Sequence, residues 1–483
     1  MALIHDLQGA ARLLDWDRET IMPETGAEAR GRIVATLHAL RHRELVRDGV
    51  SDDIALLEEH GDLTVAERAM VRQARREHDR AKRVPEDLVR ATSEATSRAV
   101  SAWMSARAEA DFSAFAPSLE RVVDLTRQTG EAIGIGAEPY DALLDTFEPH
   151  MTTAQVEELF GDLRRKLSTI VEGVDAGDGR GAEPFADRSW PAPAQLMVAE
   201  DIARMIGFDL EAGLIAQSAH PFTGSPHAGD TRFTTRLTEN DPTGNVLVTL
   251  HELGHALYSQ GLPDELDRTL LFGSPSLGAD ESQSRFFENH IGRRGAFWER
   301  IHPLFVTRFG DTMDGLTPEG FQRAVTRVRR GWCRVDADEV TYDLHIILRF
   351  ELELALIRDD LQVADLPGAW AEGMQRLVGV TPASDAQGCL QDIHWAWGMF
   401  GYFPTYTLGN IYAAQLAEAL ERQEGPLDEL VRAGAFDVVL AFMRHRVHRH
   451  GDTYPTGELM ERATGGPFST DAFLRRIRSL ASG

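Results

Sequence analysis

Apolar side chains recur every three or four residues over most of this chain, which is the spacing of a helix with one buried face. The stretches that follow this pattern most clearly are residues 64–128, 152–175, 345–362 and 409–448. The first of them is also rich in alanine, glutamate and arginine, which favour helix. Thr152, followed by Gln155, has the spacing of a capping box and predicts a helix start. The pattern therefore predicts a mainly helical protein.

One region, residues 213–250, departs from the helical pattern. β-Branched residues are concentrated at 231–237, which suits a strand. Residues 240–244 read Asn-Asp-Pro-Thr-Gly and have the composition of a turn. We expect a small antiparallel sheet here, beside the helix that carries the candidate metal motif described below. The predicted fold class is therefore mainly α with a small β element.

A glycine-rich stretch at residues 174–184 is the best candidate for a junction between lobes. We expect a single catalytic domain over 1–483, with an N-terminal helical lobe at about 1–175 and a second, metal-binding lobe at about 185–483. The chain shows no internal repeat and no low-complexity linker.

Composition narrows the class of protein. A net charge of −26 disfavours non-specific binding to nucleic acid or to an anionic membrane. No run of 18 apolar residues is present, and the N-terminal residues lack a signal-peptide core. The two cysteines, Cys333 and Cys389, cannot build a disulfide framework, although the sequence alone leaves one disulfide open. A reduced, cytoplasmic protein without a membrane partner is expected.

The strongest chemical signal is the sequence His-Glu-Leu-Gly-His at residues 251–255. On a helix, His251 and His255 project from one face and can supply two ligands to a tetrahedral Zn²⁺. Glu252 can then take a proton from a water at the open coordination position. No other charge lies between Thr249 and Gln260, so a packing explanation for these buried polar groups is difficult. The pattern predicts a zinc metallopeptidase.

A catalytic zinc site needs a third protein ligand, and Glu281 is the best candidate. It is the first residue of a polar segment, Glu-Ser-Gln-Ser, that is expected to form a second helix. The connection that precedes this segment is long enough for the chain to reverse its direction. Weaker candidates for the third ligand are Asp280, Asp264, Glu265 and His290. His345 and the histidines of residues 443–450 have no convincing partner pattern, and that segment is expected to be a solvated helix end.

With these residues in place, the chain resembles the carboxypeptidase Taq family of metallopeptidases over nearly its whole length. The similar elements, in order, are the stretch at 13–30 that begins Leu-Leu-Asp-Trp-Asp-Arg-Glu, His-Pro-Phe at 220–222, Asp-Thr-Arg-Phe-Thr at 230–234, the metal motif at 251–255, Glu-Ser-Gln at 281–283, Arg-Val-Asp-Ala-Asp at 334–338, and Gly-Cys-Leu-Gln-Asp-Ile-His-Trp at 388–395. Two positions depart from the family pattern. Asp280 stands where the family usually has His, and Cys333 stands where Ile is usual.

The resemblance implies a mostly helical, saddle-shaped fold with a deep groove, like that of neurolysin-type oligopeptidases. It also implies Glu281 as third ligand, a cytoplasmic homodimer, and release of single C-terminal residues other than proline from peptides. Zn²⁺ is the expected cofactor, with Co²⁺ or Mn²⁺ as substitutes. Two alternatives remain: an endo-acting or dipeptide-releasing oligopeptidase on the same scaffold, and an inactive helical peptide-binding protein.

Further site residues follow from the same resemblance. His394 and Tyr406 are candidates for stabilising the transition state, with Tyr402 as the alternative hydroxyl. Arg334 is the candidate for the terminal carboxylate of the substrate, because arginine offers two parallel donors. Arg232 is the second choice, since Asp230 beside it suggests an ion pair, and His220 is expected to line the groove.

Overall fold

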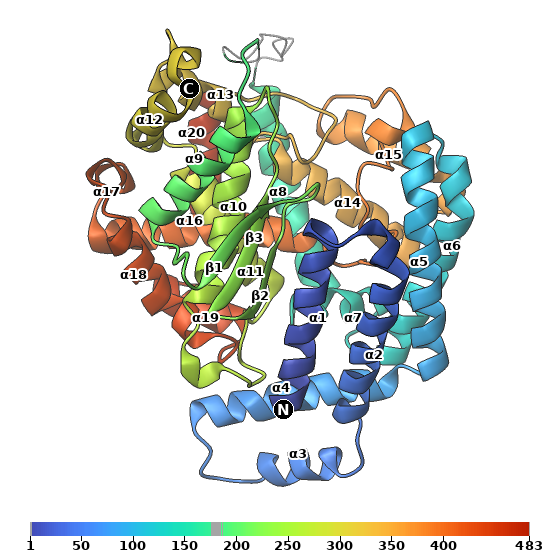
Figure 1. The fold of residues 1–483 in the computed structure, drawn as a ribbon. Coiled ribbons are helices and arrows are strands. Elements are labelled where there is room, and N and C mark those ends of the chain that lie inside the picture. The colour runs from blue at the N-terminus through green and yellow to red at the C-terminus, as the bar shows by residue number, and fades with distance from the viewer. Residues whose placement is uncertain (1, 175–184, 186, 483) are drawn as a thin grey trace. The chain divides into compact units, whose positions relative to one another are not determined.

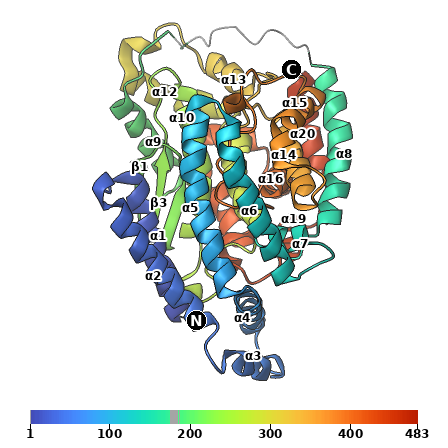
Figure 2. The same ribbon diagram turned by 90° about the vertical axis from the view of Figure 1, so that its right-hand side faces the viewer.

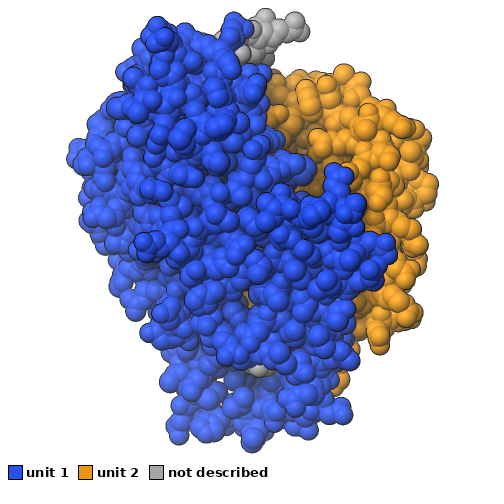
Figure 3. All heavy atoms as spheres, in the orientation of Figure 1, with its two compact units in different colours: residues 1–81, 182–326, 409–473 blue, residues 82–181, 327–408, 474–483 orange. Residues whose placement is uncertain are grey.

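The computed structural model describes residues 2–174, 185 and 187–482 and is mainly helical, as predicted (Figure 1). Clustering of contacts divides the chain into two compact units, which are coloured separately in Figure 3. Unit 1 consists of residues 1–81, 182–326 and 409–473, and unit 2 consists of residues 82–181, 327–408 and 474–483. The predicted lobe junction lies, apart from Val174, outside the described residues, and the proposed lobe limits stay a prediction.

Unit 1 contains the sheet and most of the helices. Its longer elements are α1 (Ala2–Thr20), α2 (Ala27–Leu45), α3 (Val50–Glu58), α4 (Val65–Arg83), α9 (Ala192–Ile206), β1 (Gly213–Gln217), β2 (Thr223–His227), β3 (Asp230–Thr235), α10 (Pro242–Gln260), α11 (Leu277–Arg285), α12 (Gly295–Phe309), α13 (Pro318–Thr326), α17 (Leu427–Ala433), α18 (Phe436–Arg446) and α19 (Thr456–Thr464). α11 continues directly into a π-helical turn, η3 (Phe286–Ile291).

Unit 2 contains helices and connecting loops, with no strand among its described residues. Its elements include α5 (Glu86–Glu109), α6 (Phe112–Ile133), α7 (Pro139–Leu144), α8 (Thr153–Glu172), α14 (Tyr342–Ile357) and α15 (Leu366–Leu377). α5 and α6 run side by side in both ribbon views (Figures 1 and 2). The capping box that predicts the start of α8 is confirmed, since Thr152 and Gln155 bond each other's backbone N–H groups. Three helices, α4, α16 (Pro404–Glu424) and α20 (Asp471–Ser482), carry residues of both units.

The small sheet is mixed, which corrects the expectation of an antiparallel sheet. β2 and β3 form an antiparallel hairpin, whereas β1 pairs with β3 in parallel. The cause is the strand order β1-β3-β2: the chain reverses twice, and β3 then enters between the two earlier strands in the direction of β1. The predicted position beside the metal-motif helix is confirmed, because Thr235 of β3 donates to Asn245 of α10 at 2.8 Å.

The first turn of α10 replaces the turn predicted at 240–244. Asp241 is the N-cap and accepts a hydrogen bond from the Gly244 N–H at 2.9 Å. Pro242 takes the first helical position, where its missing N–H costs nothing. The sequence Asp-Pro-Thr-Gly is compatible with a turn and with the start of a helix, and the apolar residues that follow favour the helix. α10 therefore begins with its polar end capped, and the motif residues 251–255 lie about two and a half to three and a half turns further along the helix.

Candidate metal centre

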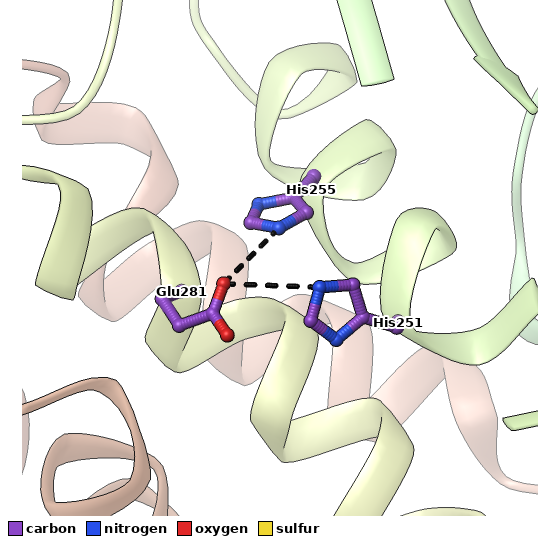
Figure 4. A group of neighbouring side chains, drawn as sticks. All are labelled: His251, His255 and Glu281. Atoms are coloured by element: carbon purple, nitrogen blue, oxygen red, sulfur yellow. Dashed lines mark ion pairs between the residues drawn. The ribbon is translucent and has the colours of Figure 1, made fainter. Parts of the chain in front are cut away.

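Three side chains in unit 1 bring possible metal ligands together (Figure 4). His251 and His255 lie one turn apart on α10, and Glu281 reaches them from α11. Nε2 of His251 lies 3.8 Å and Nε2 of His255 lies 3.5 Å from Oε2 of Glu281. One ligand atom from each residue lies within 4.8 Å of the others, and no other such group of His, Cys, Asp or Glu exists among the described residues. A single cation could contact all three.

Each histidine has a carboxylate on its other ring nitrogen. Glu288, in the π-helical turn η3, lies 2.9 Å from Nδ1 of His251 in a hydrogen bond. Asp280 lies 3.0 Å from Nδ1 of His255, an ion pair by distance that lacks hydrogen-bond geometry. A carboxylate at Nδ1 favours the tautomer whose Nε2 lone pair is available to a metal. Both rings therefore present Nε2 to Glu281.

Glu281 is held from two sides. Its Oε1 accepts a hydrogen bond from Nε of Arg285 at 2.6 Å, which leaves Oε2 for the histidines. Arg285 also donates to Glu288 at 3.1 Å and so joins the two carboxylates that face His251. Gly409 packs against Glu281 so closely that a Cβ at this glycine would lie 2.5 Å from the Glu281 Cγ. Space for the Glu281 side chain thus depends on the absence of a side chain at position 409.

A second glycine sets the distance between α10 and α11. Gly254 lies inside the metal motif, and a Cβ there would lie 2.5 Å from the carbonyl oxygen of Gln283. The two helices can approach at this point only because no side chain separates them. This close approach brings Glu281 within reach of His251 and His255.

Glu252 occupies the position expected of a general base and is 6% exposed. The hydroxyl of Thr223, on β2, donates to its Oε2 at 2.7 Å. The same hydroxyl lies 3.0 Å from the Glu252 carbonyl oxygen. Sequence reasoning did not identify Thr223, although it directly follows the His-Pro-Phe element at 220–222. The strand next to α10 therefore fixes the carboxylate that adjoins the first histidine.

The buried carboxylates that face the two histidines have lowered pKa values and stay ionised. Burial alone would raise the pKa of Glu281, but Arg285 and the two histidines hold it well below its usual range. The pKa of Glu288 is likewise lowered to about 2, against the effect of burial, by Arg285, His251 and Arg293. Burial would lower the pKa of His255, yet Asp280, Glu281 and Glu252 raise it well above its ordinary value. Ionised carboxylates around imidazole rings favour bound positive charge.

The weaker ligand candidates do not join the cluster. Asp264 and Glu265 are exposed in a short 3₁₀ turn, η2 (Asp264–Leu266). His290 is buried and its ring stacks on Phe286. Asp280 contacts the second histidine and lies outside the three-residue group.

In unit 2, Arg334 belongs to a buried ion network. Its Nε and Nη2 donate to Oδ1 of Asp392 at 3.0 and 2.7 Å, and its Nη1 donates to the Tyr342 hydroxyl at 3.2 Å. Arg349 donates to Oδ2 of the same aspartate at 2.7 Å. Burial would raise the pKa of Asp392, but the two guanidinium groups hold it far below its usual range. Two cations thus share one carboxylate, and the trio carries a net positive charge.

His394 and Tyr406 are brought together as predicted. Nε2 of His394 lies 3.3 Å from the Tyr406 hydroxyl, and the Tyr402 ring packs against both. Burial, reinforced by Arg334 and Arg349, lowers the pKa of His394 to about 3 despite Asp392, so its ring is neutral at neutral pH. The guanidinium of Arg334 lies 5.0 Å from the centre of the Tyr406 ring. The predicted unit 2 residues therefore form one group.

A buried glutamate holds the loop that carries His394. Glu353, on α14, accepts hydrogen bonds from the Tyr140 hydroxyl at 2.7 Å, from Nε1 of Trp395 at 2.8 Å and from the Gly401 N–H at 3.0 Å. Two of these donors directly adjoin His394 and Tyr402 in the chain. Burial raises the pKa of Glu353 to about 7, although its three donors and Arg349 oppose the shift.

Two other predicted residues lie in unit 1. Arg232 forms a two-point pair with Asp230, at 2.6 and 2.9 Å, and lies over the Trp16 ring at 4.9 Å. The ion pair that the sequence suggested is confirmed. His220 is exposed and lies in the connection between β1 and β2.

Comparisons with known proteins show which family this chain is similar to. Residues 1–480 match the sequence model of the carboxypeptidase Taq (M32) metallopeptidase family. A relative called thermostable carboxypeptidase 1, from Thermus thermophilus, is 39% identical over 482 residues, which cover 97% of this chain and 94% of the relative.

Solved structures give the same result. An M32 carboxypeptidase from Deinococcus radiodurans superposes with a TM-score of 0.94 at 35% identity, covering 100% of this chain and 98% of that one. Metallocarboxypeptidase 1 from Trypanosoma cruzi superposes with a TM-score of 0.95 at 34% identity, and the match covers 100% of this chain and 98% of that one. The chain therefore belongs to the carboxypeptidase Taq (M32) family and is a metallocarboxypeptidase.

Proposed function

We propose that this enzyme uses Zn²⁺ to release single amino acids of broad type, other than proline, from the C-termini of peptides. The observation that carries the proposal is the cluster of His251, His255 and Glu281, with ligand atoms within 4.8 Å of one another and Glu252 on the same helix. An inactive peptide-binding relative would be free to lose one of these four side chains, and all four are present.

The donor set fits a divalent cation. Two imidazole nitrogens and one carboxylate oxygen are the ligand types that zinc accepts in hydrolytic enzymes, where a fourth position stays open. Each histidine has a carboxylate beside Nδ1, which supports Nε2 as the coordinating atom. Co²⁺ and Mn²⁺ accept the same donors, so they are the expected substitutes.

Bound there, the metal would polarise the scissile carbonyl and make a nearby water more acidic. Glu252 accepts the proton of the attacking water and later delivers it to the leaving amine. Thr223 holds the Glu252 carboxylate through one oxygen, which leaves the other oxygen available for this transfer. Because Glu252 is buried, bulk water has little access to its carboxylate. The lower local polarity strengthens its electrostatic interaction with the reacting groups.

The negative oxygen of the transition state needs donors beyond the metal. We assign this role to Tyr406 and His394, with Tyr402 as the alternative hydroxyl. The support is their mutual packing, together with a His394 pKa so low that the ring is neutral at neutral pH. A neutral His394 can orient the Tyr406 hydroxyl without adding a third cation to Arg334 and Arg349.

A carboxypeptidase also needs a fixed positive charge for the substrate terminus. We assign it to Arg334, because Arg334, Arg349 and Asp392 together keep one net positive charge in a buried setting. Arg232 is the second choice, because its two-point pair with Asp230 is neutral as a whole, whereas the trio around Arg334 keeps a net positive charge. We also propose that His220, which is exposed, contacts the peptide.

Mass spectrometry of a digested model peptide tests this function. A ladder of single C-terminal losses that stops at proline is the expected result. Internal cuts, or losses of two residues at a time, would instead favour the endo-acting or dipeptide-releasing alternative. An unchanged peptide in the presence of added zinc would favour the inactive binding protein.

We further propose that the enzyme is a cytoplasmic homodimer, which rests on the family resemblance. Cys333 and Cys389 are not joined by a disulfide, which is compatible with a reducing compartment. Among the described residues, no helix combines the length and apolarity needed to cross a membrane. Light scattering in solution tests the dimer, and a monomeric mass would reject it.

A further inference from the structure

The histidine-rich segment at residues 443–450 is not uniformly solvated, contrary to the expectation from sequence. His445 is exposed at the end of α18, but His448, in the short turn η7 (His448–His450), is completely buried. A buried histidine among exposed basic residues requires a partner, because an unpaired polar group inside a protein is unfavourable.

The first partner of His448 is Gln283, on the helix that carries Glu281. Nε2 of His448 lies 2.9 Å from Oε1 of Gln283, and both residues are fully buried. The Gln283 amide nitrogen donates to Ser282, which identifies its oxygen as the acceptor of the His448 bond. Burial and Arg444 lower the pKa of His448 to about 3, so a neutral ring donates through Nε2–H. This bond reaches α11 two residues beyond Glu281.

The second contact of His448 is with α10, the helix of the two histidine ligands. Its ring packs against the ring of Tyr258 with 5.0 Å between the centroids. Tyr258 follows His255 by three residues on the same helix. Gly261, directly after the helix, also packs closely against His448, since a Cβ at this glycine would lie 2.4 Å from Nδ1 of His448. One imidazole thus touches both ligand-bearing helices.

The turn that presents His448 is itself fixed. Arg72 of α4 donates to the carbonyl oxygens of Asp452 and Thr453 at 3.3 and 3.1 Å. Gln73 donates to Oδ1 of Asp452 at 2.9 Å. The Asp452 N–H donates to the Leu271 carbonyl at 3.0 Å, in the connection that leads to α11. The segment that carries His448 is therefore also fixed by α4, and its position does not depend only on α10 and α11.

We propose that His448 is a positioning residue for the metal centre: it fixes α10 against α11 so that His251, His255 and Glu281 converge. The inference rests on the proposed ligand set. Loss of the His448 donor leaves Gln283 with a buried acceptor that has lost its bond, which is more damaging than the loss of an exposed bond. In addition, the bond that fixes α11 next to Glu281 is absent, so metal affinity is the property that changes.

The test compares His448→Met, which removes the donor, with His448→Gln, which keeps an N–H near the same place. The dissociation constant for Zn²⁺ alone is measured by competition with a chelating dye, and the melting temperature of each metal-free protein is recorded. We expect affinity to fall about tenfold or more in His448→Met and less than about threefold in His448→Gln. His445→Met, an exposed histidine of the same segment, is the matched control and should bind zinc like the parent.

A double variant, His448→Met with Gln283→Met, covers the case in which the single variant does not fold. Replacing both partners by apolar groups removes the unpaired acceptor, so the double variant is expected to fold and still bind zinc weakly. Parental affinity in a folded His448→Met protein or in the double variant would refute the positioning role. If Glu281→Ala kept a full equivalent of tightly bound zinc, the ligand assignment and this inference would fail together. Loss of zinc in Glu281→Ala with parental affinity in His448→Met would reject the inference alone.

Discussion

The Asp280 carboxylate lies 3.0 Å from Nδ1 of His255, while Nε2 of the same ring lies 3.5 Å from Glu281. Asp280 and Glu281 are adjacent on one helix, where successive side chains point about 100° apart. They therefore approach the ring from different sides and serve different purposes. In the proposed function, Asp280 orients the ring and Glu281 completes the ligand set.

From this contact we expect Asp280→Ala to weaken zinc binding about 10- to 100-fold without abolishing it, because the ring loses its orienting partner and keeps its ligand atom. Asp280→His, which restores the residue usual in the family, should change affinity modestly. The dissociation constant for Zn²⁺ is the measurement. Glu288→Gln, the corresponding change at His251, should give a loss of similar size. A loss of zinc in Asp280→Ala as complete as in Glu281→Ala would make Asp280 a ligand.

Removal of the metal should abolish activity. Treatment with a chelator is expected to give an inactive protein that regains activity with Zn²⁺ or Co²⁺. Elemental analysis of Glu281→Ala should show less than one tightly bound equivalent, since two histidines alone bind zinc weakly. Glu265→Ala, an exposed carboxylate between the two ligand helices, is the control and should retain its zinc.

Glu252→Gln should keep the fold and the zinc but lose turnover by several orders of magnitude, because the amide cannot accept the proton of the water. Thr223→Val should lower kcat by about tenfold, because it removes only the hydroxyl that holds the base. Thr223→Ser keeps that hydroxyl and should recover most of the rate. Activity of Glu252→Gln within about tenfold of the parent would show that another group is the base.

Arg334→Ala should cut kcat/KM by at least about tenfold for peptides with a free C-terminus, since the carboxylate loses a charge-assisted pair. Arg334→Lys should recover part of the loss, because a single ammonium group cannot offer two parallel donors. Peptides with an amidated terminus should be poor substrates for the parent and no worse for the variants.

A structural role for Arg334 gives a different result. Its observed partner is the buried Asp392. If the pair only supports the fold, the Arg334→Ala protein should have a much lower melting temperature than the parent. Its activity should then fall equally on peptides with a free and with an amidated C-terminus. Arg232 would then become the residue to test for the carboxylate.

The buried Glu353 makes a prediction about pH. Its pKa is about 7 in the folded protein, against an ordinary value of 4.5. Between pH 4.5 and pH 7, Glu353 is therefore protonated in the folded state and ionised in the unfolded state. Stability contributed by this proton is present below pH 4.5 and is lost as the pH rises through about 7. The loss is on the order of 3 kcal/mol.

Denaturant unfolding of Glu353→Gln checks this dependence. Because glutamine does not titrate, the free energy of unfolding of the parent should fall relative to that of the variant between pH 4.5 and pH 7.5. Glu372→Gln, an exposed residue of α15, should show no such trend. A difference between parent and Glu353→Gln that does not vary with pH would contradict the raised pKa.

The sequence predicted what depends on local spacing. His251 and His255 form their pair through the geometry of one helix, so a four-residue interval was sufficient. The capping box of α8 and the Arg232–Asp230 pair are likewise short-range and were predicted correctly. The mainly helical fold followed from the periodicity, and the family resemblance fixed its type.

What the sequence did not reveal depends on contacts between distant segments. Thr223 meets Glu252 only because β2 lies beside α10. Glu288 was not noticed, since its role arises from the π-helical turn that places it at His251. The parallel pairing of β1 also required knowledge of the strand order, which alternation of apolar residues does not encode. In each case, tertiary packing determines the outcome and no local pattern records it.

The hydrogen bond between His448 and Gln283 spans 165 residues of the chain. Because a ribosome adds residues from the N-terminus, both ligand helices are made well before the imidazole that bridges them. At about 5–20 residues per second, the interval is on the order of ten seconds. During that time the nascent chain holds two histidines and a glutamate without the contact that, in the positioning role proposed for His448, makes them converge. On that proposal, metal acquisition is expected to be a late event in the biogenesis of this enzyme, after the segment around residue 448 has been made.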